Sequence, residues 1–160
     1  MRRLRYLSRF CLSTLCGAGI ALTLGLSLLP ASAWGVEPSI DNLKARLSST
    51  SVGDRPHLCV QIAKMQMEET DKFYAADNVQ QAQTALTDVV AYAELARDYA
   101  IQSHKYQKQT EIAVRVMARR LSDLAHSMPH DYQPPLRDAL KRLQRVRDDL
   151  LASMFPQGAK

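Results

Sequence analysis

The longest regular pattern of apolar and small residues in the chain runs from Val79 to Leu124. Steps of three and four residues alternate along it without a slip, which is the a/d spacing of a heptad repeat. No Gly or Pro interrupts the stretch up to about His126. The pattern therefore predicts one nearly continuous helix, about 70 Å long at about 1.5 Å per residue, with a left-handed supercoil. We call these a/d positions the seam; they are Val79, Ala82, Leu86, Val89, Ala93, Ala96, Ala100, Ser103, Gln107, Thr110, Val114, Met117, Leu121 and Leu124.

Two shorter apolar stripes flank the long one. The first begins near Asp54 and ends near Ala75, and the second runs from about Leu136 to Met154. Short connections make successive helices antiparallel. The two shorter helices are therefore predicted to lie end to end along the long one and to meet near residues 100–110, where the seam becomes polar.

No strand pattern competes with these helices. The predicted fold class is all-α: a signal peptide followed by an antiparallel helical bundle or coiled coil, built on one long central helix with two shorter helices. The predicted organisation is a signal peptide at 1–33, an extended leader with a short helix and a linker at 34–53, a helical domain at 54–155 and a tail at 156–160.

The first 33 residues have the three parts of a secretory signal peptide. Four arginines precede an apolar run from Phe10 to Leu29, and Ala31-Ser32-Ala33 supplies a small-residue cleavage site before Trp34. The mature protein is expected to be periplasmic or secreted, and to touch the membrane only transiently through its signal peptide. An N-terminal membrane anchor is the alternative, because about 20 apolar residues can span a bilayer.

Most of the formal net charge of +5 comes from the predicted signal peptide, residues 1–33. Removing its four arginines from the 21 basic residues leaves 17, against 16 acidic residues. A nearly neutral mature chain gives no reason to expect nucleic acid as a partner.

Metal and thiol chemistry has few candidates. Cys59 is the only cysteine after the leader, and we interpret it as a small buried apolar side chain. His126, Met128 and His130 are of types that can bind copper, but Pro129 interrupts any helical arrangement of them. No cofactor and no metal are predicted, and a metal or ligand sensor that uses this turn or Cys59 is the alternative.

Catalytic signatures are missing from the sequence. It contains no nucleophile elbow, phosphate-binding loop or zinc-protease helix motif. The chain is therefore predicted not to be an enzyme, and a hydrolase whose site the sequence does not reveal is the least favoured alternative.

Aromatic and basic side chains supply the candidates for an interaction surface, which are Tyr92, Tyr99, Tyr106, Arg115, Arg119 and Arg142. The tyrosines recur every seven residues beside the seam, and the arginines belong to the densest basic stretch of the mature chain. A solvated, ion-paired face is the simpler interpretation of the basic stretch. Small residues in the seam permit close approach of a partner helix. The predicted function is a non-enzymatic exported protein that interacts with another envelope protein, or with itself, as a binding partner or scaffold.

Two segments, 100–105 (AIQSHK) and 133–136 (QPPL), resemble parts of small exported bacterial all-helical proteins that have no assigned activity. That resemblance covers most of the mature chain. It implies an all-helical fold and no functional residue.

Overall fold

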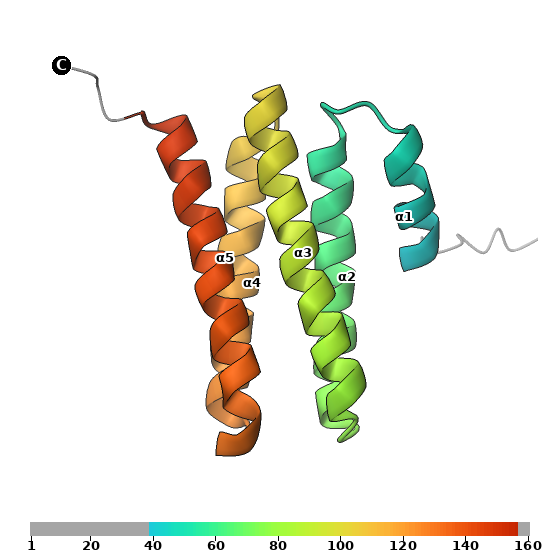
Figure 1. Ribbon diagram of the computed structural model, residues 1–160, viewed down its shortest axis with the longest axis vertical. Coiled ribbons are helices and arrows are strands. Elements are labelled where there is room, and N and C mark those ends of the chain that lie inside the picture. Colours follow the sequence, from blue (N-terminus) through green and yellow to red (C-terminus); the bar gives the residue numbers. More distant parts are fainter. Residues whose placement is uncertain (1–38, 157–160) are drawn as a thin grey trace, which may run out of the picture. The chain divides into compact units, whose positions relative to one another are not determined.

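Helices account for nearly all of the chain that the computed structural model describes, residues 39–156 (Figure 1). The elements are α1 (Ile40–Ser49), α2 (Arg55–Ala75), α3 (Val79–Ser103), α4 (Gln107–Ser127), a short 3-10 turn η1 (His130–Tyr132) and α5 (Gln133–Met154). These residues contain no strand, so the all-helical fold is confirmed. The predicted signal peptide, the leader residues 34–38 and the tail residues 157–160 lie outside the described residues.

Local chemistry explains where most of the helices begin. Ser39 caps α1 by accepting a hydrogen bond from the backbone N–H of Asn42, and Asn78 caps α3 in the same way through Gln81. Pro56 in α2 lies in a first turn, where the missing N–H costs nothing. The breaks predicted near Ala75 and before Leu136 are confirmed.

The prediction of one long central helix is wrong. The chain leaves helical geometry after Ser103, and α4 begins at Gln107. His104 and Tyr106 have φ angles of 55° and 60°, in the left-handed region that terminates a right-handed helix. Ser103 holds the turn: its Oγ donates to the carbonyl of Tyr99 (2.6 Å) and accepts from the backbone N–H of Lys105 (3.3 Å).

Burial of apolar surface explains this reversal. In a continuous helix the two halves of the seam would lie too far apart to share one core. The turn brings both halves together, so that their apolar side chains are buried in the same core. Leu86 of α3 and Leu121 of α4 belong to the same cluster of buried side chains. The predicted end-to-end arrangement of the two shorter helices is therefore also wrong, and coiled-coil supercoiling stays a prediction.

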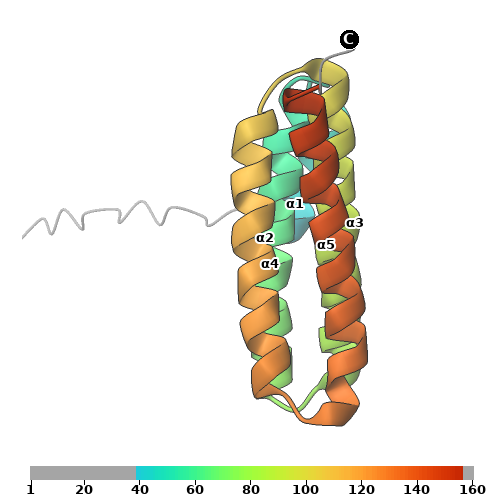
Figure 2. The ribbon, with the colours of Figure 1, turned by 90° about the vertical axis from the view of Figure 1, so that its left-hand side faces the viewer.

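Helices α2 to α5 form a four-helix bundle. Helix α2 packs most extensively against α3, and α4 against α5. In Figure 2 the α4–α5 hairpin lies in front of the α2–α3 hairpin, with α4 against α2 and α5 against α3. The turn at residues 104–106 therefore crosses the end of the bundle diagonally. As a result α2 and α4 run parallel and begin at the same end.

Helix α1 lies outside the four helices, against α2 (Figure 1). Its Leu43 is fully buried with Leu58 and Ile62 of α2. Its Lys44 Nζ lies 3.1 Å from Oδ2 of Asp88 on α3. The short helix predicted within residues 34–53 is confirmed as α1, and it packs against the bundle. None of the helices from α1 to α5 is long and apolar enough to cross a membrane.

Candidate functional site

The three tyrosines predicted as an interaction strip have separate environments. Tyr92 lies under the ammonium of Lys44, which is 5.5 Å from the ring centroid, and Tyr99 lies under the guanidinium of Arg55 at 5.2 Å. Both rings are half-buried by contacts inside the molecule. Tyr106 is exposed and lies in the turn between α3 and α4. Because the chain reverses there, the three do not form one strip.

The three candidate arginines also differ in availability. Arg142 donates through Nε and Nη2 to the two carboxylate oxygens of Glu94 (3.0 and 2.8 Å), so it joins α5 to α3. Arg115 lies 3.8 Å from the carboxylate of Glu111, which also accepts from Arg147. Among the described residues Arg119 makes no ion pair, and it is exposed on α4. Arg119 is therefore the most available of the three for a partner.

The outward side of α4 carries two large aliphatic side chains in water. Ile112 is 40% exposed and Val116 is 60% exposed. They lie one helical turn apart, and Arg115 and Arg119 lie beside them on the same side of the helix. We call these four residues the α4 face. The α4 face was not predicted, because Ile112 and Val116 lie outside the seam. Their spacing of four residues next to two arginines is the sequence signal that indicates it.

The hairpin formed by α4 and α5 has more basic than acidic side chains. Residues 107–154, which hold α4 and α5, include nine basic and six acidic side chains. A cavity of about 300 Å³ on this side is lined by Arg115, Arg119 and Arg147, with one acidic residue, Asp123. The surroundings of the α4 face are therefore basic.

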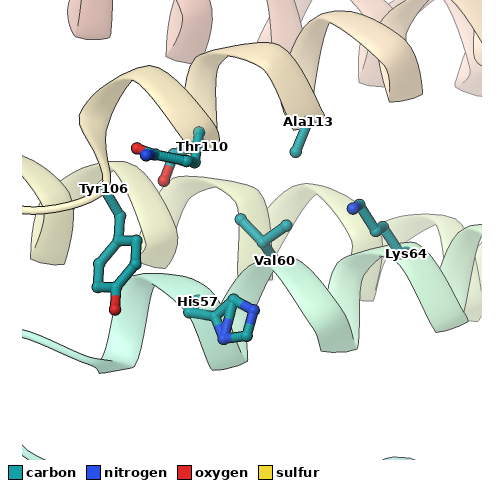
Figure 3. A pocket seen from close by; sticks show the side chains of 7 residues that line it. His57, Val60, Lys64, Tyr106, Thr110 and Ala113 are labelled. Carbon is teal, nitrogen blue, oxygen red and sulfur yellow. The ribbon is translucent and has the colours of Figure 1, made fainter.

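A second cavity, of about 280 Å³, lies between the first turns of α2 and α4 (Figure 3). Its lining residues are His57, Val60, Lys64, Tyr106, Gln109, Thr110 and Ala113. The rings of His57 and Tyr106 stack across it, with centroids 6.0 Å apart. We call it the α2–α4 cavity. This cavity could not be predicted from the sequence, because its two walls become neighbours only through the reversal at residues 104–106.

Thr110 is the most unusual residue of this cavity. It is 1% exposed, and its Oγ1 has no hydrogen-bond partner among the described residues. An unpaired buried hydroxyl costs free energy, so Thr110→Val should raise the free energy of unfolding by about 1 kcal/mol. Urea denaturation measures the change.

Thr70 is the matched control for this substitution. It is also fully buried, but its Oγ1 donates to the carbonyl of Gln66 at 2.8 Å. Thr70→Val should therefore lower the free energy of unfolding by about 1 kcal/mol. Equal losses in both variants would show that the Thr110 hydroxyl is paired.

The candidate metal and thiol residues, His126, Met128, His130 and Cys59, do not form a site together. His126 is exposed, and its Nδ1 lies 2.6 Å from the carbonyl of Ser122; His130 is exposed in η1, and Met128 is half-buried. Within residues 39–156 no three His, Cys, Asp or Glu side chains are grouped so as to hold a metal ion.

Cys59 is fully buried, and this burial raises the pKa of its thiol to about 11, although nearby Arg55 opposes the shift.

The raised pKa of Cys59 makes stability depend on pH. The unfolded thiol ionises near 9.0, whereas the folded thiol keeps its proton to about pH 11. Its contribution to the free energy of unfolding is thus complete below about pH 9 and is lost as the pH rises through about 11. Urea denaturation of wild type and Cys59→Ala should show the stability of the wild type falling relative to the variant over this range. Rapid labelling of the native thiol at neutral pH would contradict the burial.

No protein-family model, curated protein or solved structure matches this chain. The α4 face and the α2–α4 cavity are therefore the features of the molecule that bear on its function.

Proposed function

We propose that this chain is a non-enzymatic exported protein whose bundle binds another envelope protein through the α4 face. The single observation that carries the proposal is the exposure of Ile112 and Val116 beside Arg115 and Arg119. An isolated exposed aliphatic residue needs no explanation, but two adjacent ones contribute apolar area that a partner can bury. Arginine is enriched in protein interfaces, where it pairs with carboxylates.

The partner proposed is an amphipathic helix with acidic residues flanking its apolar stripe. Residues one turn apart on α4 can contact such a stripe at matching spacing. The basic excess of residues 107–154 favours an acidic partner, since complementary charge speeds and orients association. Arg119 is available for this role, whereas Arg142 is occupied by Glu94.

Export is part of the proposal and rests on the leader alone: four arginines, an apolar run and the cleavage motif at Ala31–Ala33. Processing there makes Trp34 the first residue of the mature protein. The intact mass of the exported protein tests this directly.

Photo-crosslinking in cells, followed by binding measurements, tests the proposed interaction. A photoreactive residue at Val116 should give a discrete adduct, while the same residue at exposed Gln83 on α3 should not. The partner identified from the adduct should bind the purified protein. Ile112→Ser with Val116→Ser should weaken that binding at least tenfold, on the order of two lost apolar side chains.

Two further variants complete this experiment. Leu95→Ser removes an exposed leucine from α3 and should leave binding unchanged. Arg119→Glu should weaken binding, because it places like charges in contact. Equal adducts at Gln83 and Val116 would contradict the proposal. An adduct between two copies of the chain would replace the acidic partner with a homodimer.

A further inference from the structure

We propose that the α2–α4 cavity binds a small aromatic carboxylate. This site is separate from the α4 face, and it supplies both a flat apolar space and groups that favour a negative charge. Its volume of about 280 Å³ is close to the lower end of known ligand sites, about 300 Å³. The ligand is therefore smaller than a typical drug molecule.

The apolar part of the cavity suits a ring. Val60 of α2 and Ala113 of α4 form opposite walls, and Tyr106 and His57 stack at the end where both helices begin (Figure 3). Aromatic side chains prefer offset or edge contacts with other rings, so this pair offers a third ring a place to pack.

The polar part of the cavity suits an anion. The buried Thr110 Oγ1 has no hydrogen-bond partner within residues 39–156, and it can donate its hydrogen to a ligand. Lys64 also lines the cavity and makes no ion pair among the described residues, so its ammonium is available. A carboxylate would satisfy both groups at once, and hydrogen bonds to a charged acceptor are the stronger kind.

The charged residues that line the cavity do not oppose this assignment. In the part of the chain that the structure describes, no acidic residue lines the cavity. Glu111, the nearest acid in sequence to Thr110, is committed to Arg147 on α5, with its Oε1 3.1 Å from Nε. Helix α4 also begins here, and its N-cap Tyr106 provides no side-chain hydrogen bond to the first turn. The positive end of the helix dipole thus adds to the attraction for an anion.

Calorimetry and methyl NMR with 3-phenylpropionate test the site on the intact exported protein. We expect saturable binding at one site, with the methyl signals of Thr110 and Ala113 shifting on titration. The neutral 3-phenylpropanol should bind about tenfold more weakly, the equivalent of one charge-assisted hydrogen bond. Inorganic phosphate has no apolar body and should not compete.

Substitutions then assign the contacts. Lys64→Met keeps the apolar stem and should raise the dissociation constant for 3-phenylpropionate about tenfold. Thr110→Val should raise it severalfold, while circular dichroism shows an unchanged fold. The matched controls Lys141→Met and Thr70→Val should leave it unchanged, as should Ile112→Ser with Val116→Ser.

Three results would overturn the proposal. The first is the absence of saturable 3-phenylpropionate binding. The second is binding that Lys64→Met and Thr110→Val do not weaken. The third is equal affinity for 3-phenylpropionate and phosphate, which would show an anion site without the aromatic specificity proposed.

Discussion

Leu121→Ala should lower the free energy of unfolding by about 2–5 kcal/mol, a large part of the stability of a small domain. Leu121 is fully buried in α4, and it belongs to one cluster of side chains drawn from α2, α3, α4 and α5. Removing three carbons of its side chain leaves a cavity that the surrounding helices can fill only in part. Because the cluster is continuous, the loss should affect the whole bundle rather than one hairpin.

Urea denaturation and hydrogen exchange measure these two aspects of the Leu121 prediction. The unfolding midpoint should fall, and amides of α3 and α4 should lose protection together. Leu95→Ala provides the control, because Leu95 is 37% exposed on α3 and should contribute less than about 1 kcal/mol. If Leu121→Ala destabilised α5 alone, the two halves of the seam would not share a core.

Ala93→Leu should destabilise the protein by about 1–3 kcal/mol. Alanines from both helices are fully buried where α2 and α3 pack, among them Ala63, Ala82, Ala93 and Ala96. Such small side chains let the two backbones approach closely, and this pair has the most extensive contact in the bundle. A leucine at residue 93 has no space between them, so it must displace α2 or adopt a strained rotamer.

The matched control for this overpacking is Ala152→Leu. Ala152 is exposed near the end of α5, so the added atoms extend into water and should change stability by no more than about 0.5 kcal/mol. Thermal denaturation of both variants is sufficient. Equal stability of Ala93→Leu and wild type would mean that α2 and α3 are not held in close contact.

Most helix boundaries could be predicted because they depend on nearby residues. Asn78 caps α3 with its own side chain, and Pro56 marks the first turn of α2. The reversal after Ser103 has no such marker, because His104, Lys105 and Tyr106 include neither Gly nor Pro. Left-handed geometry costs a non-glycine residue about 1–2 kcal/mol. That cost is met by packing between distant residues, which a local pattern does not contain.

The candidate sites show the same division. The basic stretch was visible in the sequence, but the pairing of Arg142 with Glu94, 48 residues away, was not. Thr110 was predicted to lie in the polar part of the seam, near residues 100–110, and it is buried. Its neighbours across the cavity, His57 and Lys64, come from another helix. Because the break at residues 104–106 was not predicted, the pairing of α2 with α4, and hence the cavity between them, could not be predicted either.

The reversal at residues 104–106 is the claim on which the core and the α2–α4 cavity depend, and a single distance tests it. Spin labels are attached at exposed residues 83 and 127, Gln83 on α3 and Ser127 on α4, after removal of Cys11, Cys16 and Cys59. The antiparallel bundle predicts a distance on the order of 20–30 Å by pulsed electron paramagnetic resonance, from the diagonal of a bundle whose neighbouring helices lie about 8–10 Å apart, plus the label linkers. One continuous helix would separate the labels by about 66 Å, and that result would contradict the fold.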